Sequence, residues 1–149
     1  MFDSCMYCSQ NDQLDQLMIK IAKLRISTLY FFRDQTHPGR CVLAINRHVQ
    51  KLTDLSDDEC ATLFSEVQLS AQILSELYQP DKINYLILGD TSPHLHVHIV
   101  PKYEGKAAWG RVFEMIPSEK TVLTSEEYSN QIQKIRSSIE TKLNYLDLC

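Results

Sequence analysis

The chain has 149 residues, of which 44% are hydrophobic and 23% charged, as expected for one globular domain with a substantial core. Its net charge of −4 excludes a general attraction to nucleic acid or to an anionic membrane, so any phosphate ligand needs a local positive potential. No segment approaches the ~20 apolar residues of a membrane span, and residues 1–10 do not resemble a secretory signal. We therefore expect a cytoplasmic, single-domain protein (residues 1–149) without membrane or nucleic-acid partners.

The first motif is Cys5-Met-Tyr-Cys8, a CxxC. The chain has five cysteines at uneven spacing, which argues against a disulfide framework. Two interpretations stay open: a pair of thiols on a loop, or part of a metal site completed by histidines, because no second cysteine pair exists. A redox role is disfavoured, since no strand precedes the motif.

The next segments predict one helix and two strands. Apolar residues recur at helical spacing over residues 11–24, with Asp12 as the N-cap. Residues 26–32 are rich in β-branched and aromatic side chains and predict a first strand, and the apolar residues 41–45 predict a second.

A turn of residues 34–39 separates these strands, and its His37 is expected at the surface. After the second strand, Ser56 and Glu59 form a capping box. The apolar stripe that follows predicts one long amphipathic helix over residues 56–79.

A third strand, residues 83–88, leads through a tight loop, residues 89–93, into a fourth strand. Strands joined by so short a loop must be antiparallel. Hydroxyl and backbone N–H groups of this loop, including those of Thr91, are suited to bind phosphate oxygens.

The fourth strand contains three of the five histidines, in the sequence His-Leu-His-Val-His-Ile. The period of two places His94, His96 and His98 on one face and the aliphatic residues on the other, which should face the core. One ion bound by all three is disfavoured, because His94 and His98 start about 13 Å apart along a strand. The histidines therefore have different roles, unless the face is simply polar, and a neutral imidazole can be a nucleophile, base or metal ligand.

The remaining residues complete the predicted fold. Thr124 and Glu127 form a second capping box, which opens a final helix of about residues 125–145. The order helix, two strands, long helix, two strands, helix favours the α+β class. We expect a mainly antiparallel sheet packed with one long helix and with N- and C-terminal helices.

The segment His-Leu-His-Val-His-Ile-Val, followed by Pro101, resembles the signature of the histidine triad (HIT) superfamily. The resemblance covers most of residues 5–111 and leaves a C-terminal helical extension of about 124–146. It implies a HIT-like fold, a homodimer, and a nucleotide hydrolase or transferase. The implied substrates are nucleoside monophosphate derivatives, either dinucleoside polyphosphates or nucleoside phosphoramidates.

In the implied mechanism His96 attacks the α-phosphorus and forms a covalent nucleotidyl-histidine, His98 binds the phosphate oxygens, and His94 orients the site. A carbonyl that accepts the Nδ1 proton of His96 would leave Nε2 free to attack, although the sequence does not identify this carbonyl. Two alternatives are a zinc-stabilised nucleotide-binding module with little or no catalysis, and a hydrolase whose zinc activates water.

The resemblance also implies ligand sets. An N-terminal CxxC in this family joins two histidines around zinc, which here would be Cys5, Cys8, His48 and His94. Four protein ligands make a closed structural site, and no organic cofactor is expected.

The implied nucleotide-binding residues lie in the turn, in the loop before the triad and after the triad: Asp34, Asp90, Thr91, Lys102 and Trp109. Asp34 corresponds to the ribose-binding position, or is simply a turn residue. Relatives often have Asn at the position of Asp90, where an ionised carboxylate cannot donate a hydrogen bond and repels phosphate. Lys102 supplies local charge or is solvated, and Trp109 lines the site or anchors a loop.

Overall fold

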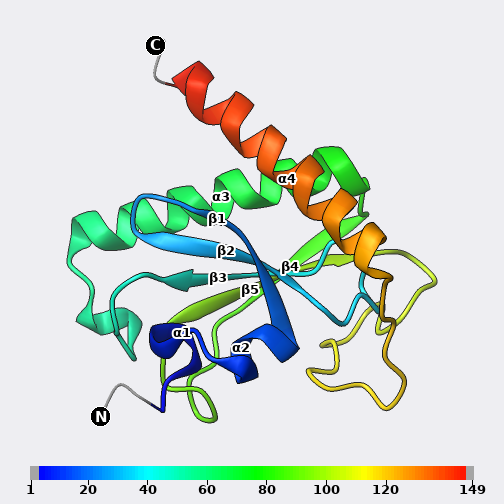
Figure 1. Cartoon of the computed structure of the whole chain (residues 1–149), viewed down its shortest axis with the longest axis horizontal. Coiled ribbons are helices and arrows are strands. Elements are labelled where there is room, and N and C mark those ends of the chain that lie inside the picture. The colour runs from blue at the N-terminus through cyan, green and yellow to red at the C-terminus, as the bar shows by residue number, and fades with distance from the viewer. Residues whose placement is uncertain (1–3, 147–149) are drawn as a thin grey trace.

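The computed structural model describes residues 4–146, so the predicted domain of residues 1–149 extends beyond the described residues at both ends. The elements are α1 (Met6–Ser9), α2 (Asp12–Leu17), β1 (Met18–Lys23), β2 (Ser27–Phe32), β3 (Cys41–Ile45), η1 (Leu52–Asp54), α3 (Asp57–Tyr78), β4 (Lys82–Leu86), β5 (His96–Lys102) and α4 (Ser125–Leu146). They form a five-stranded sheet with α3 and α4 on one side and α1 and α2 on the other (Figure 1). This confirms the predicted α+β class.

The sheet has the strand order β1-β2-β3-β5-β4, and all neighbouring strands are antiparallel. Non-sequential strands β3 and β5 lie side by side at its centre, with Val42 opposite His98 and Ala44 opposite His96. The triad strand therefore lies between β3 and β4, within reach of the turn that precedes β3.

The main core lies between the sheet and the two long helices. Leu95, Val97 and Ile99 belong to it, as predicted for the aliphatic face of the triad strand. From the helices, the core includes Leu63, Val67 and Leu74 of α3 and Ile132, Ile135 and Ile139 of α4. Burial of these apolar side chains is the main stabilising contribution, and it directs the histidine face toward α1 and α2.

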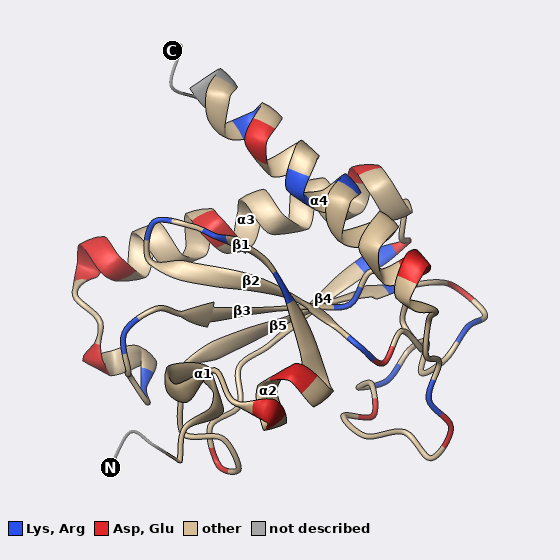
Figure 2. Ribbon diagram, in the orientation of Figure 1, with Lys and Arg blue, Asp and Glu red and all other residues tan. Residues whose placement is uncertain are grey.

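Both long helices begin at the predicted capping boxes. The Ser56 hydroxyl accepts from the backbone N–H of Glu59, whose carboxylate accepts from the Ser56 N–H. Thr124 and Glu127 make the same reciprocal bonds at the start of α4. Acidic residues also gather in the first turn of α3 (Figure 2), where the positive end of the helix dipole stabilises them.

The predicted helix over residues 11–24 is wrong in its second half. Helix α2 ends at Leu17, and the following residues form the edge strand β1, paired with β2. The N-cap is Asn11 rather than Asp12, since the Asn11 side chain accepts two backbone N–H bonds. Met18 packs below the sheet and Ile21 packs above it. Burial on both faces of a strand produces the three-residue spacing that imitates a helix.

Among the described residues, no helix combines the length and the apolar character required to cross a bilayer.

The turn before β3 requires a glycine at position 39. A side chain at this position should lower the stability of the protein. The φ of Gly39, +88°, is in the left-handed region, and a Cβ there would lie 2.9 Å from the Tyr78 ring. We expect Gly39→Ala to lower the free energy of unfolding by about 2–4 kcal/mol, because backbone strain and overpacking add. Denaturant titration measures this change.

Gly105→Ala is the matched control, because Gly105 has a φ of +72° but open space around it. It should cost only the backbone term of about 1–2 kcal/mol. Equal losses for the two variants would contradict a packing role for Gly39.

Candidate functional site

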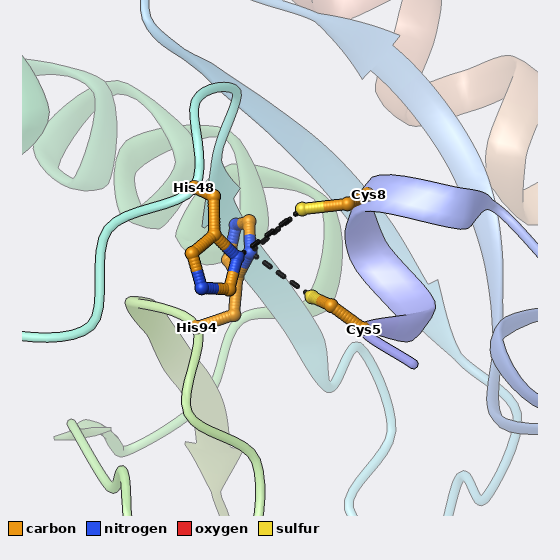
Figure 3. Close-up of side chains that lie close together, drawn as sticks. All are labelled: Cys5, Cys8, His48 and His94. Carbon is orange, nitrogen blue, oxygen red and sulfur yellow. Dashed lines mark hydrogen bonds between the residues drawn. The ribbon is translucent and has the colours of Figure 1, made fainter. Parts of the chain in front are cut away.

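Two cysteines and two histidines from distant parts of the chain meet at one end of the triad strand. Cys5 and Cys8 lie at α1, His48 follows β3, and His94 precedes β5 (Figure 3). One ligand atom from each residue lies within 4.8 Å of all the others. The Sγ of Cys5 is 3.4 Å from His94 Nδ1, and the Sγ of Cys8 is 3.3 Å from His48 Nδ1. Four such atoms surround a point that could hold a metal ion.

The chemistry of these groups suits a cation. The Nε2 atom of His94 is 2.8 Å from the Ile45 carbonyl oxygen, to which its proton is donated. The Nδ1 lone pair is therefore directed to the thiols. Desolvation, together with the Cys5 thiol, raises the pKa of the exposed Cys8 to about 11. Two thiolates this close are unfavourable unless a cation balances them.

His96 is held in one tautomer by the backbone. Its Nδ1 lies 2.6 Å from the carbonyl oxygen of His94, so Nδ1 carries the proton and Nε2 keeps its lone pair. This carbonyl is the partner that the sequence did not identify. Burial is the main cause that lowers the pKa of His96, which keeps the ring neutral. A neutral imidazole with Nε2 unprotonated can act as a nucleophile.

His98 lies beside His96, with 5.0 Å between the ring centroids. Neither of its ring nitrogens has a hydrogen-bond partner within residues 4–146, although the side chain is buried. Burial, then the neighbouring His96 and Arg40, lowers the pKa of His98 to about 3. Buried polar atoms are normally hydrogen-bonded, so two free nitrogens here indicate a ligand-binding position.

The turn before β3 is buried against the same face, so the surface position predicted for His37 is wrong. His37 is only 5% exposed, because the Phe113 ring covers it with 6.0 Å between the centroids. Asp34 is also buried, and its Oδ1 accepts hydrogen bonds from Thr36 and from the Thr121 N–H. The segment after the triad thus covers the turn, which local sequence patterns do not reveal.

Lys102 and Trp109 lie at the end of β5 remote from the metal cluster. Lys102 is buried and donates to the carbonyl oxygens of Ala108 and Arg111, so it is not a solvated lysine. These bonds hold the turn that carries Trp109. Trp109 and Lys102 line a pocket of about 490 Å³ together with Lys82, Asn84, Gly110, Arg111 and Val112.

Asp90 and Thr91 are exposed in the loop before His94. The structure places them at the metal-cluster end of β5, whereas Lys102 and Trp109 lie at the other end. The five predicted nucleotide-binding residues therefore do not converge on one point, and each remains a prediction.

Three side chains of the site were missed by sequence reasoning. Tyr7 stacks beside His94 and His96, with centroid distances of 4.9 and 5.4 Å. Phe113 lies 6.3 Å from His98, and Arg40 lies beneath Phe113. Only Tyr7 had an available signal, because it lies inside the CxxC that the metal cluster positions.

The comparison with known families agrees with this geometry. Residues 27–105 match the model of the HIT domain. The chain belongs to the HIT family. The triad strand and the strands around it lie inside the matched region, whereas the CxxC and α4 lie outside it.

Curated relatives resemble the chain over different lengths. An adenosine 5′-monophosphoramidase of Schizosaccharomyces pombe is 26% identical over 133 residues, covering 87% of this chain and 99% of the relative. A bis(5′-nucleosyl)-tetraphosphatase of the same organism is 33% identical over 70 residues, covering 44% of this chain and 38% of the relative. The chain thus spans about two fifths of the tetraphosphatase, and a similar 40% of an AP-4-A phosphorylase of Mycobacterium tuberculosis.

Solved structures confirm the HIT fold. A histidine triad protein of Bradyrhizobium japonicum superposes with a TM-score of 0.78 at 28% identity, covering 87% of this chain and 96% of that one. A Zn-bound histidine triad family protein of Mycobacterium smegmatis superposes with a TM-score of 0.67, covering 95% and 97% of the two chains. At 19% identity this second likeness shows the fold alone.

The four-residue cluster predicts that metal content depends on the CxxC. Cys8→Ser should reduce bound metal from about one ion per chain to a small fraction, because one of the four ligands is lost. It should also lower the thermal midpoint, since metal binding contributes to folding. Elemental analysis and thermal unfolding measure the two effects.

Cys60→Ser is the control, because Cys60 lies in α3 outside the cluster. Its metal content should equal that of the wild type. Full metal occupancy in Cys8→Ser would rule out this cluster as the binding site.

Proposed function

We propose that the protein is a nucleotide hydrolase or transferase that works through a covalent nucleotidyl-histidine. The observation that carries this proposal is the His94 carbonyl, which accepts a hydrogen bond from Nδ1–H of His96 and leaves Nε2 unprotonated. The names of the relatives, a monophosphoramidase and a tetraphosphatase, support nucleoside phosphoramidates and dinucleoside polyphosphates as the substrate class.

The residues support a two-step displacement. Nε2 of His96 attacks the α-phosphorus, and the bond to the leaving group breaks as the N–P bond forms. Water then cleaves the N–P bond, which releases the nucleoside monophosphate and restores the imidazole. His98 is neutral and offers an N–H donor to the phosphate oxygens, where negative charge develops.

We propose zinc as the ion of the metal cluster, in a structural role. Two thiols and two imidazoles are a usual ligand set for structural zinc, and four protein ligands leave no position for a substrate. His94 links the two sites, because its side chain is a ligand and its carbonyl orients His96. Bound zinc would therefore stabilise the tautomer of the nucleophile.

The predicted nucleotide contacts remain part of the proposal. Asp34 has a buried Oδ2 without a hydrogen-bond partner in the described part of the chain, which supports a contact with a hydroxyl group of the ligand. Lys102 contributes indirectly, because its hydrogen bonds hold the turn that contains Trp109. The aromatic ring of Trp109 can stack on a base. Asp90 and Thr91 are exposed in the loop before His94, and we retain them as predicted contacts.

We also propose that residues 1–149 form a single HIT domain that assembles as a homodimer. Ile132, Ile135 and Ile139 of α4 belong to the main core, which supports α4 as an integral part of the domain. Strand β4 is an edge of the sheet, and a groove of about 1030 Å³ between it and α3 exposes apolar side chains. Phe64 and Tyr85 in this groove are 45% and 52% exposed, as suits an interface.

The nucleophile predicts the outcome of its removal. His96→Ala should lower the release of nucleoside monophosphate by roughly a thousandfold or more, because the proposed intermediate forms on its Nε2. Fold and metal content should be unchanged. Release is measured with diadenosine tetraphosphate, adenosine phosphoramidate and a guanosine counterpart.

Cys60→Ser serves again as a control for a substitution remote from the triad. Activity retained by His96→Ala would exclude the proposed intermediate. Binding without release by the wild type would instead favour a nucleotide-binding module, and Asp90→Asn would then be the next variant.

The apolar groove predicts how the dimer can be broken. Tyr85→Lys should convert a dimer to a monomer, because it places a charge in the proposed interface. Light scattering measures the mass. Ile116→Lys is the control, since Ile116 is 80% exposed and lies outside the groove. A monomeric wild type, or an intact dimer in Tyr85→Lys, would contradict this interface.

A further inference from the structure

An arginine is completely buried beside the histidine triad. Arg40 immediately precedes β3 and is 0% exposed. Val42, two residues later, pairs with His98 of β5. Alternate residues of a strand share a face, so Arg40 lies on the same face as Val42. It therefore lies on the histidine face, next to the Val42–His98 pair. The short separation is consistent with the effect of Arg40 on the His98 ring, whose pKa it helps to lower.

The contacts of Arg40 leave most of its donors unused. The guanidinium carbon lies 4.0 Å from the Phe32 ring centroid and 5.1 Å from that of Phe113. Nη2 reaches only the sulfur of Met115, at 3.6 Å, and sulfur is a weak acceptor. Nη1 is 3.9 Å from Asp34 Oδ2, which is too long for a hydrogen bond.

Unpartnered buried atoms concentrate at this point. Within the part of the chain that the structure describes, five buried side-chain nitrogen and oxygen atoms have no hydrogen-bond partner. They belong to three residues only: Nε and Nη1 of Arg40, Nδ1 and Nε2 of His98, and Oδ2 of Asp34. A neutral His98 ring has one N–H and one lone pair, so three of the five atoms, Nε and Nη1 of Arg40 and one nitrogen of His98, are donors without an acceptor.

The charges in this region do not balance. Three buried charged side chains act on the pKa of His37: the cations Arg40 and Lys102, and the carboxylate of Asp34. The pKa of His37 is lowered, first by burial and then by these two cations, so His37 adds no negative charge. A buried net positive charge is costly unless an anion compensates it.

We propose that Arg40, beside His98, is a further anion-binding residue and binds a phosphate group of the substrate. A guanidinium presents parallel N–H donors that match two phosphate oxygens, whereas a lysine offers a point charge. The adjacent His98 supplies a further donor to the same group. That this phosphate belongs to a nucleotide rests on the proposed function; the anion subsite itself does not.

The subsite is covered by the segment that follows β5. Phe113 lies over both Arg40 and His98, and Thr121 fastens the segment to the turn through hydrogen bonds with Asp34 and Gln35. A phosphate can therefore reach Arg40 only when Phe113 moves. Trp109, the single tryptophan of the chain, lies in the same segment and reports this movement by its fluorescence.

The test compares AMP with adenosine, so that only the phosphate differs. Titration of Trp109 fluorescence, with calorimetry as a check, gives both dissociation constants without turnover. For the wild type we expect AMP to bind about tenfold to a hundredfold more tightly, the scale of hydrogen bonds to a charged group. In Arg40→Met this preference should fall to a few-fold, while affinity for adenosine is retained.

Arg33→Met is the matched control, because Arg33 also lies over an aromatic ring, at 5.5 Å from the Tyr128 centroid, but its Nε donates to the Asp15 carbonyl oxygen instead of lying beside His98. It should keep the wild-type preference for AMP. If Arg40→Met does not fold, Arg40→Lys decides, because it keeps the charge but loses the bidentate fork. An undiminished preference for AMP in either folded Arg40 variant would overturn the subsite.

Thermal unfolding with inorganic phosphate tests the anion subsite independently of any nucleotide activity. A wild type that binds neither AMP nor adenosine would refute a nucleotide enzyme. In that case, a rise in the thermal midpoint with phosphate that is lost in the Arg40 variant would still support the subsite. Absence of any protection by phosphate would overturn it.

Discussion

His94 is the residue on which the arrangement of the site depends. Its Nδ1 faces the two cysteines, its Nε2–H donates a hydrogen bond to the Ile45 carbonyl, and its own carbonyl accepts a hydrogen bond from Nδ1–H of His96. One residue therefore connects α1, β3 and the candidate nucleophile. Because each of its polar groups has a defined partner, its position determines the tautomer of the neighbouring ring.

The histidine face is enclosed by two covers that are held in different ways. Helix α1 places Tyr7 against His94 and His96 and is connected to the sheet through the cysteine–histidine cluster. The segment after β5 places Phe113 against His98 and is fastened by hydrogen bonds of Thr121. A metal ion would make the first cover rigid, whereas the second can open by breaking a few hydrogen bonds.

Burial lowers the pKa of both His98 and Arg40, but only His98 loses its charge at neutral pH. Burial lowers the pKa of His98 to about 3, so this ring gives up its charge. Burial also lowers the pKa of Arg40, but only to about 10, so the guanidinium stays charged at neutral pH. The face thus combines neutral imidazoles with a permanent positive charge, which would favour an anionic ligand.

The sequence by itself determined the features that depend on neighbouring residues. Alternation revealed the histidine face and the core face of β5, and the capping residues Ser56 and Thr124 marked the starts of both long helices. Family resemblance added the cluster of Cys5, Cys8, His48 and His94, which the structure brings together.

The tertiary structure alone decided what depends on contacts between distant residues. It converted residues 18–23 into an edge strand, because pairing with β2 outweighed local helical spacing. It identified the carbonyl that holds His96, and it buried His37 and Arg40 beneath a segment more than 70 residues later in the chain. No local pattern encodes such contacts, because they arise only when the sheet brings its strands and loops together.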